Sequence, residues 1–166
     1  MYEITNTIDS TAKAYYLAYR TLIKSHIDLC NFSNDTFSVY VFPAITSAVF
    51  SCEIALKNLI FLETGKEVRG HDLSRLFKQL SSDKQRNYMD ITIKLYNRCS
   101  KFQKHNANIN ANIFNEKLVM CSNNFVEFRY LYEGGKKTDL DFLEAFMFAV
   151  NDLQNEYEDF ICTYRR

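Results

Sequence analysis

The sequence has few residues that interrupt a helix. It contains one proline, four glycines and no tryptophan among 166 residues. Because proline and glycine are the usual breaks in regular structure, few breaks are expected, and apolar residues recur with the 3.6-residue period of a helix along most of the chain. The length suits one domain with its own hydrophobic core. Residues 1–166 are therefore predicted to form a single all-α domain.

The sequence also lacks an excess of charge of either sign, because 20 basic and 20 acidic side chains cancel. Attraction to nucleic acid or to an anionic membrane would therefore need a local cluster of basic residues. The N-terminus, MYEITNTIDS, lacks the basic flank and apolar run of a signal peptide. No apolar stretch is expected to reach the ~20 residues that cross a bilayer. We therefore expect a cytoplasmic protein that makes no contact with a membrane.

Neither the cysteines nor the histidines form a recognisable ligand set. The five cysteines are odd in number, and no two have the C-x-x-C spacing of a zinc or redox motif, so we expect thiols in a reducing cytoplasm. The three histidines are scattered, with no cysteine or carboxylate at ligand spacing. A glycine-rich phosphate loop and a G-x-S-x-G motif are also missing. The sequence predicts neither a metal site nor a cofactor.

The helical period and the capping residues predict an up-and-down bundle of five to six helices. Pro43 suits the first turn of the second helix, and Gly65 lies where that helix should end. Residues 31–42 are expected to be a turn-rich connection with a short extended end. Thr138 is expected to cap a last helix that includes Phe160. The earlier helices are predicted at about 9–30, 43–64, 72–80, 82–101 and 112–133.

The stretch from Pro43 to Leu80 is the most specific part of the sequence. Its apolar helix carries Glu53 and Lys57 one turn apart, and G-H-D-L, with His71 and Asp72 at its centre, opens the next helix. Polar groups in a helix this apolar must find partners or lie at its edge. We therefore expect structural roles for these four residues, with the histidine and the aspartate at a helix N-terminus, where a side chain caps free N–H groups. Arg129, beside an apolar seam of the fifth helix, is the expected partner of Glu53.

Three segments resemble the HEPN superfamily (higher eukaryotes and prokaryotes nucleotide-binding). The first two are C-E-I-A-L-K-N-L-I, Cys52 to Ile60, and G-H-D-L-S-R-L-F, Gly70 to Phe77, with the Gly65 turn between them. The third, N-x-F-V-E-F-R-Y-L-Y-E, Asn123 to Glu133, is similar to a late helix of some uncharacterised bacterial members. The resemblance covers roughly residues 10–133. It implies a helical bundle, commonly a homodimer.

The resemblance also implies two kinds of activity. Many members of the superfamily are metal-independent endoribonucleases of toxin–antitoxin, phage-defence and CRISPR-associated systems, with an arginine and a nearby histidine on one helix paired across a dimer. Others lack that pair and act as non-catalytic RNA-binding or partner modules, often beside a nucleotidyltransferase. Arg129 is not followed by a histidine at the required distance, so its position is expected to be catalytically empty.

Arg98 and His105 are the candidates for the catalytic pair, with six residues between them. At ~100° per residue they return to nearly the same helix face. The histidine could move a proton near neutral pH and the arginine could neutralise charge on the phosphorane, while Lys94, Lys101 and Lys104 could contact RNA phosphates. Two features depart from the family pattern. A cysteine follows the arginine where active members place a polar residue, and the histidine lies where an Asn-rich stretch, QKHNANINAN, begins.

Three functional hypotheses follow from these observations. The favoured one is a HEPN-like module without robust catalysis that binds RNA or a partner protein, such as a nucleotidyltransferase or an antitoxin, in a defence or toxin–antitoxin type system. The second is a metal-independent endoribonuclease that uses Arg98 and His105. The third is a helical scaffold whose aromatic seams bind another protein.

Overall fold

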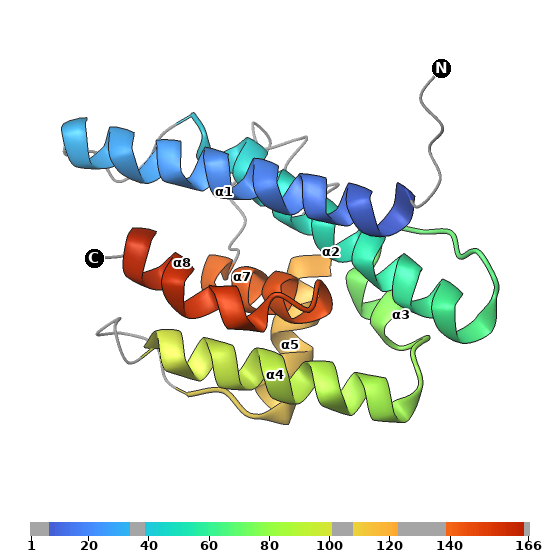
Figure 1. Ribbon diagram of the computed structural model, residues 1–166. Coiled ribbons are helices and arrows are strands. Elements are labelled where there is room, and N and C mark those ends of the chain that lie inside the picture. The colour runs from blue at the N-terminus through green and yellow to red at the C-terminus, as the bar shows by residue number, and fades with distance from the viewer. Residues whose placement is uncertain (1–6, 34–38, 101–107, 123–138, 165–166) are drawn as a thin grey trace, which may run out of the picture.

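The computed structural model describes residues 7–33, 39–100, 108–122 and 139–164, and their regular structure is entirely helical (Figure 1). The prediction of an all-α chain is therefore confirmed for these residues. Seven α-helices and one 3₁₀ turn are present in them. They are α1 (Thr7–Ser33), α2 (Val41–Thr64), α3 (Leu73–Phe77), α4 (Ser82–Ser100), α5 (Ala111–Ser122), α7 (Leu140–Val150), the 3₁₀ turn η2 (Gln154–Glu156) and α8 (Tyr157–Tyr164).

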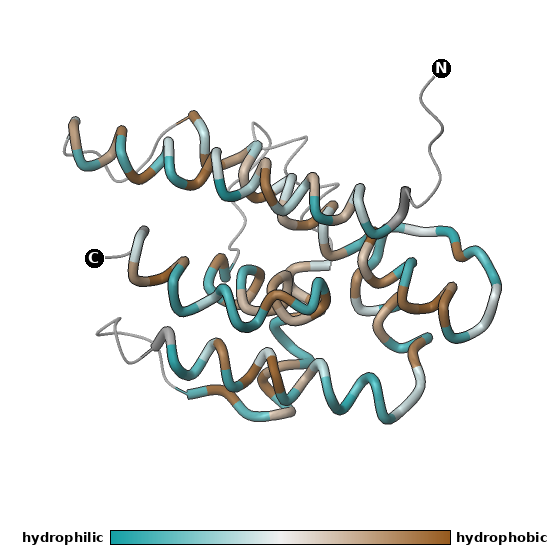
Figure 2. The backbone as a smooth tube through the Cα atoms, viewed as in Figure 1, coloured by the Kyte–Doolittle hydropathy of each residue, from teal (hydrophilic) through white to brown (hydrophobic). Residues whose placement is uncertain are grey.

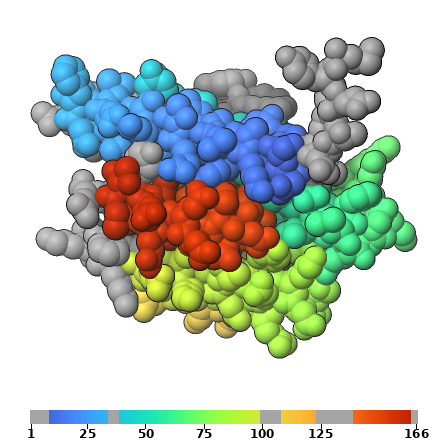
Figure 3. Space-filling model, viewed as in Figure 1, coloured from blue at the N-terminus to red at the C-terminus, as the bar shows by residue number. Residues whose placement is uncertain are grey.

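The helices are arranged around α2 and α7. The long helices α1 and α2 form an antiparallel hairpin, α7 packs against α2 on one side and α4 on the other, and α5 contacts α3, α4 and α7 (Figure 1). Figure 3 shows α8 and the turn before it covering the space between α1 and α4 on one face of the molecule. One continuous hydrophobic core takes side chains from all seven α-helices.

Helix α7 is almost entirely apolar and forms the centre of this core. All nine residues from Phe142 to Val150 are buried, which is the pattern of a helix surrounded by neighbours. Phe114 of α5 packs against Phe142 and Phe146 at ring-centroid distances of 5.4 and 6.1 Å, and Phe77 of α3 lies 5.8 Å from Phe146. Hydrophilic residues gather instead in the connection between α2 and α3 and in the first turns of α4 (Figure 2).

The connection between the first two helices is shorter than predicted. Helix α1 continues to Ser33, because no glycine or proline ends it earlier, and α2 already begins at Val41. The short extended end expected in 31–42 is therefore wrong, since Val39 and Tyr40 form a turn that leads directly into the helix. Gly65 ends α2 as predicted, with φ at 67° and its N–H donated to the Phe61 carbonyl oxygen at 2.7 Å.

The last helix is not continuous. Helix α7 ends at Val150, the N–H groups of Asp152 and Leu153 turn back to the carbonyls of Ala149 and Phe148, and α8 begins at Tyr157 after a 3₁₀ turn. The cap also lies one residue later than predicted. Asp139, rather than Thr138, accepts the N–H of Phe142 at 3.0 Å.

By length and composition alone, α2 could cross a membrane. The expectation that no apolar stretch reaches this length was therefore wrong. In the folded chain most of the apolar window in Val41–Thr64 is buried against other helices. A core helix of a soluble protein passes the same test, so this feature is weak evidence of membrane insertion.

Candidate functional site

Three of the predicted polar residues meet at the junction of α2 and α3. Glu53 lies on the buried face of α2, and its side chain is only 5% exposed. The Lys57 ammonium donates to Glu53 Oε1 at 2.7 Å, and His71 Nδ1 lies 3.0 and 3.1 Å from the two carboxylate oxygens. The side chain of His71 is 60% exposed. The buried Glu53 carboxylate therefore contacts an imidazole that lies at the surface.

This contact fixes the proton on one nitrogen of the imidazole. A carboxylate can only accept hydrogen bonds, so Nδ1 must carry the proton that it donates to Glu53. The N-cap of α3 is supplied by Asp72, whose carboxylate accepts the N–H of Arg75 at 2.9 Å. The two adjacent residues thus have separate roles. His71 holds the segment before α3 against Glu53 of α2, and Asp72 caps the N-terminus of α3.

Several predicted site residues cannot be placed. His105, Lys101, Lys104 and Arg129 lie outside the described residues. The shared face of Arg98 and His105, and the pairing of Arg129 with Glu53, therefore stay predictions. Arg98 itself lies on the exposed side of α4, where its guanidinium forms an ion pair with Glu158 of α8.

The exposed side of α4 carries a stripe of charged residues spaced four apart. Arg86, Asp90, Lys94 and Arg98 follow one another on this stripe, and all four are exposed. Lys84, at the start of the helix, approaches Glu63 of α2 at 3.6 Å. Among the described residues, Arg86 and Lys94 form no ion pair. Their cationic groups are therefore available to an anionic ligand.

The sequence analysis did not foresee two polar contacts around α7, one buried and one partly buried. Glu144, fully buried, accepts a hydrogen bond from the hydroxyl of Tyr19 on α1. At the start of the same helix, the Asp139 carboxylate forms an ion pair with Lys117 and accepts the Tyr96 hydroxyl at 3.1 Å. The rule that singled out Glu53 could have found Glu144, since it is the lone charged residue in the apolar stretch FLEAFMFAV.

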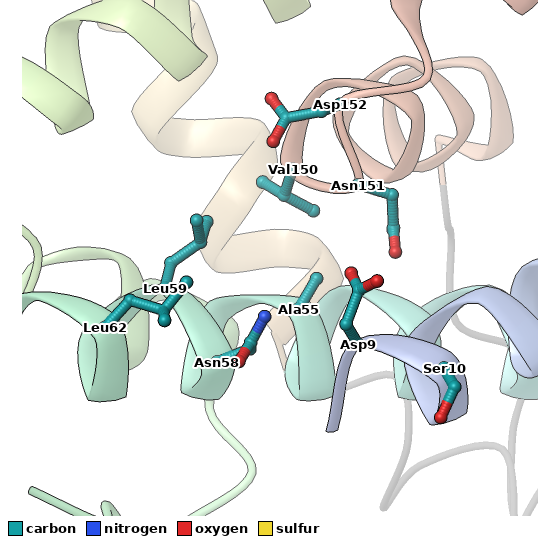
Figure 4. Close-up of a pocket in the computed structure, with 9 residues that line it drawn as sticks. All are labelled: Asp9, Ser10, Ala55, Asn58, Leu59, Leu62, Val150, Asn151 and Asp152. Carbon is teal, nitrogen blue, oxygen red and sulfur yellow. The ribbon is translucent and has the colours of Figure 1, made fainter. Parts of the chain in front are cut away.

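A pocket of about 490 Å³ opens beside this core, between the start of α1, the middle of α2 and the turn that follows α7 (Figure 4). It is lined by Asp9, Ser10, Ala55, Asn58, Leu59, Leu62, Val150, Asn151 and Asp152. This pocket could not be predicted from the sequence, because its residues come from three distant segments. Asp152 is unusual within it, since its φ of 56° lies in the left-handed region that favours glycine.

The cysteines whose side chains are described, Cys30, Cys52, Cys121 and Cys162, are free thiols. Burial raises the pKa of the Cys52 thiol well above its usual value and that of Cys121 to about 12, so these two act as small apolar core residues. In the part of the chain that the structure describes, no three His, Cys, Asp or Glu side chains are grouped to hold a metal ion.

The chain matches no family model, no curated protein and no solved structure. The function of this chain must therefore be inferred from its own residues and their arrangement.

Proposed function

We propose that this chain is a HEPN-like helical module that acts by binding RNA along the exposed face of α4 rather than by cutting it. The observation that carries the proposal is the pair of exposed cations Arg86 and Lys94 on the charged stripe of α4, neither of which forms an ion pair among the described residues, with Asp90 one turn from each. Cations spaced along one helix face can follow a phosphate backbone, and such contacts supply most non-specific affinity for nucleic acids.

The state of Arg98 supports binding over catalysis. Its guanidinium is occupied by the carboxylate of Glu158, so it would have to leave that pair before it could neutralise a phosphorane. The polar cluster around Glu53 is likewise engaged internally, because its carboxylate holds both Lys57 and His71. These groups serve the fold, and the exposed cations of α4 are better suited to phosphate contact.

The resemblance to the HEPN superfamily supports the remaining parts of the proposal. They are an up-and-down bundle, a homodimer in the cytoplasm, and a role in a defence or toxin–antitoxin type system beside a nucleotidyltransferase or an antitoxin.

Binding of a labelled single-stranded RNA, followed by fluorescence anisotropy over a salt series, tests the proposal. Lys94→Glu should weaken binding several-fold at ~50 mM salt and less at ~200 mM, because a lost phosphate contact matters less when counterions screen it. The matched control is Lys24→Glu, which reverses an exposed lysine on α1. Equal losses for the two variants, or no binding by the native chain, would reject the α4 surface.

Endoribonuclease activity is the second candidate. It is favoured by the position of Arg98, which is half exposed at the end of α4, a few residues before His105. Incubation of total RNA with the native chain, His105→Ala and Arg98→Ala decides between the candidates. Cleavage by the native chain alone would establish the ribonuclease, whereas intact RNA in all three samples agrees with a binding module.

A further inference from the structure

The contact between His71 and Glu53 defines the chemistry of the exposed imidazole. Nδ1 donates a hydrogen bond to the carboxylate, and it lies 3.0 Å from Oε1 and 3.1 Å from Oε2. When one ring nitrogen of a neutral imidazole carries the proton, the other carries a lone pair. In His71 that other nitrogen is Nε2. The carboxylate therefore selects Nε2 as the nucleophilic atom of this side chain.

The imidazole lies where another molecule can reach it. The side chain of His71 is 60% exposed, and every residue from Gly65 to His71 is exposed except Val68, which is partly buried. Gly70, directly before the histidine, has a φ of 107°, and a Cβ at that position would have no described atom within 4 Å beyond its sequence neighbours. The connection that carries His71 therefore borders open space.

Glu53 also stabilises the charge that a reaction at Nε2 produces. When Nε2 attacks an electrophile, the ring becomes a cation, because Nδ1 keeps its proton while Nε2 forms a new bond. The Glu53 side chain is only 5% exposed, so little water screens its charge from a ring 3.0 Å away. Lys57 donates to Oε1 at 2.7 Å, but His71 contacts both oxygens, so the ammonium does not displace the ring. This arrangement favours a positively charged product.

Two other roles for His71 fit the structure less well. It completes no metal site in the described part of the chain, since no three His, Cys, Asp or Glu side chains are grouped there. It does not line the pocket between α1, α2 and the turn after α7, so it cannot act as a base on a substrate held in that pocket. Its neighbours instead favour an anionic electrophile, because three basic and two acidic side chains lie within residues 66–75.

We propose that His71 is a phosphorylation site, with Nε2 as the phosphoryl acceptor and Glu53 as the positioning residue. The donor class is a phosphoramidate, in which phosphorus is bonded to a protonated nitrogen, as in the phosphohistidine of another protein. The Nε2 lone pair forms a bond to phosphorus, the P–N bond of the donor breaks, and its electron pair leaves with the nitrogen, which departs uncharged. The ring becomes a phosphorylated cation that keeps the Nδ1 proton and faces the Glu53 carboxylate.

Incubation of the full chain with potassium phosphoramidate tests the proposal, and ³¹P NMR with peptide mass spectrometry follows the product. His71 should be phosphorylated several-fold faster than His26, which is partly buried and whose Nδ1 contacts Cys30 Sγ at 3.5 Å. The product should carry phosphorus on Nε2. Glu53→Gln should slow the reaction at His71 about fivefold, because the charge opposite the ring is lost. The matched control, Glu67→Gln, removes an exposed carboxylate of the same connection and should react as the native chain does.

The unfolded chain separates this chemistry from ordinary histidine reactivity. In concentrated urea His71 should lose its advantage over His26 and form both ring isomers, because no carboxylate then holds Nδ1. The proposal is overturned if native His71 reacts no faster than His26, if phosphorus attaches to Nδ1, or if folded Glu53→Gln reacts at the native rate. Circular dichroism checks that this variant folds, and if it does not, the rate and ring isomer at native His71 decide. No RNA is present, so the result is independent of the proposed RNA surface.

Discussion

At the scale of single residues, Glu53 has the most demanding position. Its carboxylate is almost withdrawn from water yet lies within 2.7 to 3.1 Å of an ammonium and an imidazole. Burying a carboxylate is costly unless hydrogen bonds and opposite charge compensate it. Lys57 and His71 supply that compensation from two directions, and in doing so they connect α2 to the segment that starts α3.

Replacing Glu53 by Gln should lower the free energy of unfolding by about 1–3 kcal/mol. The amide keeps the shape of the side chain and can still accept from Lys57, but it leaves the ammonium without a countercharge. Urea denaturation measures the loss, and the nitrogen chemical shifts of the His71 ring report whether Nδ1 still carries its proton. Glu67→Gln, an exposed site in the same connection, is the control. Similar losses for the two variants would contradict a structural role for the cluster.

At the scale of elements, α3 depends on its neighbours. Five residues are too few for a helix that is stable alone. Its first turn is capped by Asp72, and the buried N–H of Ser74 donates to Ser122 Oγ of α5 at 2.8 Å. The hydroxyl of Ser122 in turn donates to the Leu118 carbonyl at 2.6 Å. This serine therefore joins α3 to α5 by one hydrogen bond within a buried contact.

Ser122→Ala should destabilise the chain by about 1–3 kcal/mol, because the buried N–H of Ser74 loses its acceptor. Hydrogen exchange should show faster exchange at Ser74 than at the amides of α2. The control is Ser47→Ala, since Ser47 also donates to a carbonyl four residues earlier but is only partly buried, and its hydrogen bond is exposed. Its effect should stay within about 0.5 kcal/mol. Unchanged exchange at Ser74 would show that α3 is held by packing alone.

The ends and contacts of these helices were only partly predictable from the sequence. Gly65 and the apolar period located the end of α2, and the spacing of Glu53 and Lys57 placed them one turn apart on it, although Arg129 was the expected partner of Glu53. The break after α7 escaped prediction because neither Asn151 nor Asp152 is a strong helix breaker, and its cause is a set of backbone hydrogen bonds. The contact of His71 with Glu53 spans 18 residues, so it depends on the path of a loop that no periodicity describes.

At the scale of the whole molecule, the two apolar helices α2 and α7 pack against each other within the hydrophobic core. Helix α2 is covered by α1, α3 and α7, and α7 is covered by α2, α4 and α5. Most of the apolar window of α2 is therefore buried, because its apolar sides face other helices. Leu56 on α2 is fully buried, whereas Leu62 on the same helix is 69% exposed.

These two leucines allow a test of the arrangement in buffer without detergent. Leu56→Ala should lower the free energy of unfolding by about 2–5 kcal/mol, since it leaves a cavity between packed helices. Leu62→Ala should change it by no more than about 0.5 kcal/mol, because its side chain already faces water. Urea denaturation of both variants measures the difference. Equal effects would mean that α2 is not packed as described, and a native chain that stays in solution only with detergent would mean that α2 is buried in lipid instead of protein.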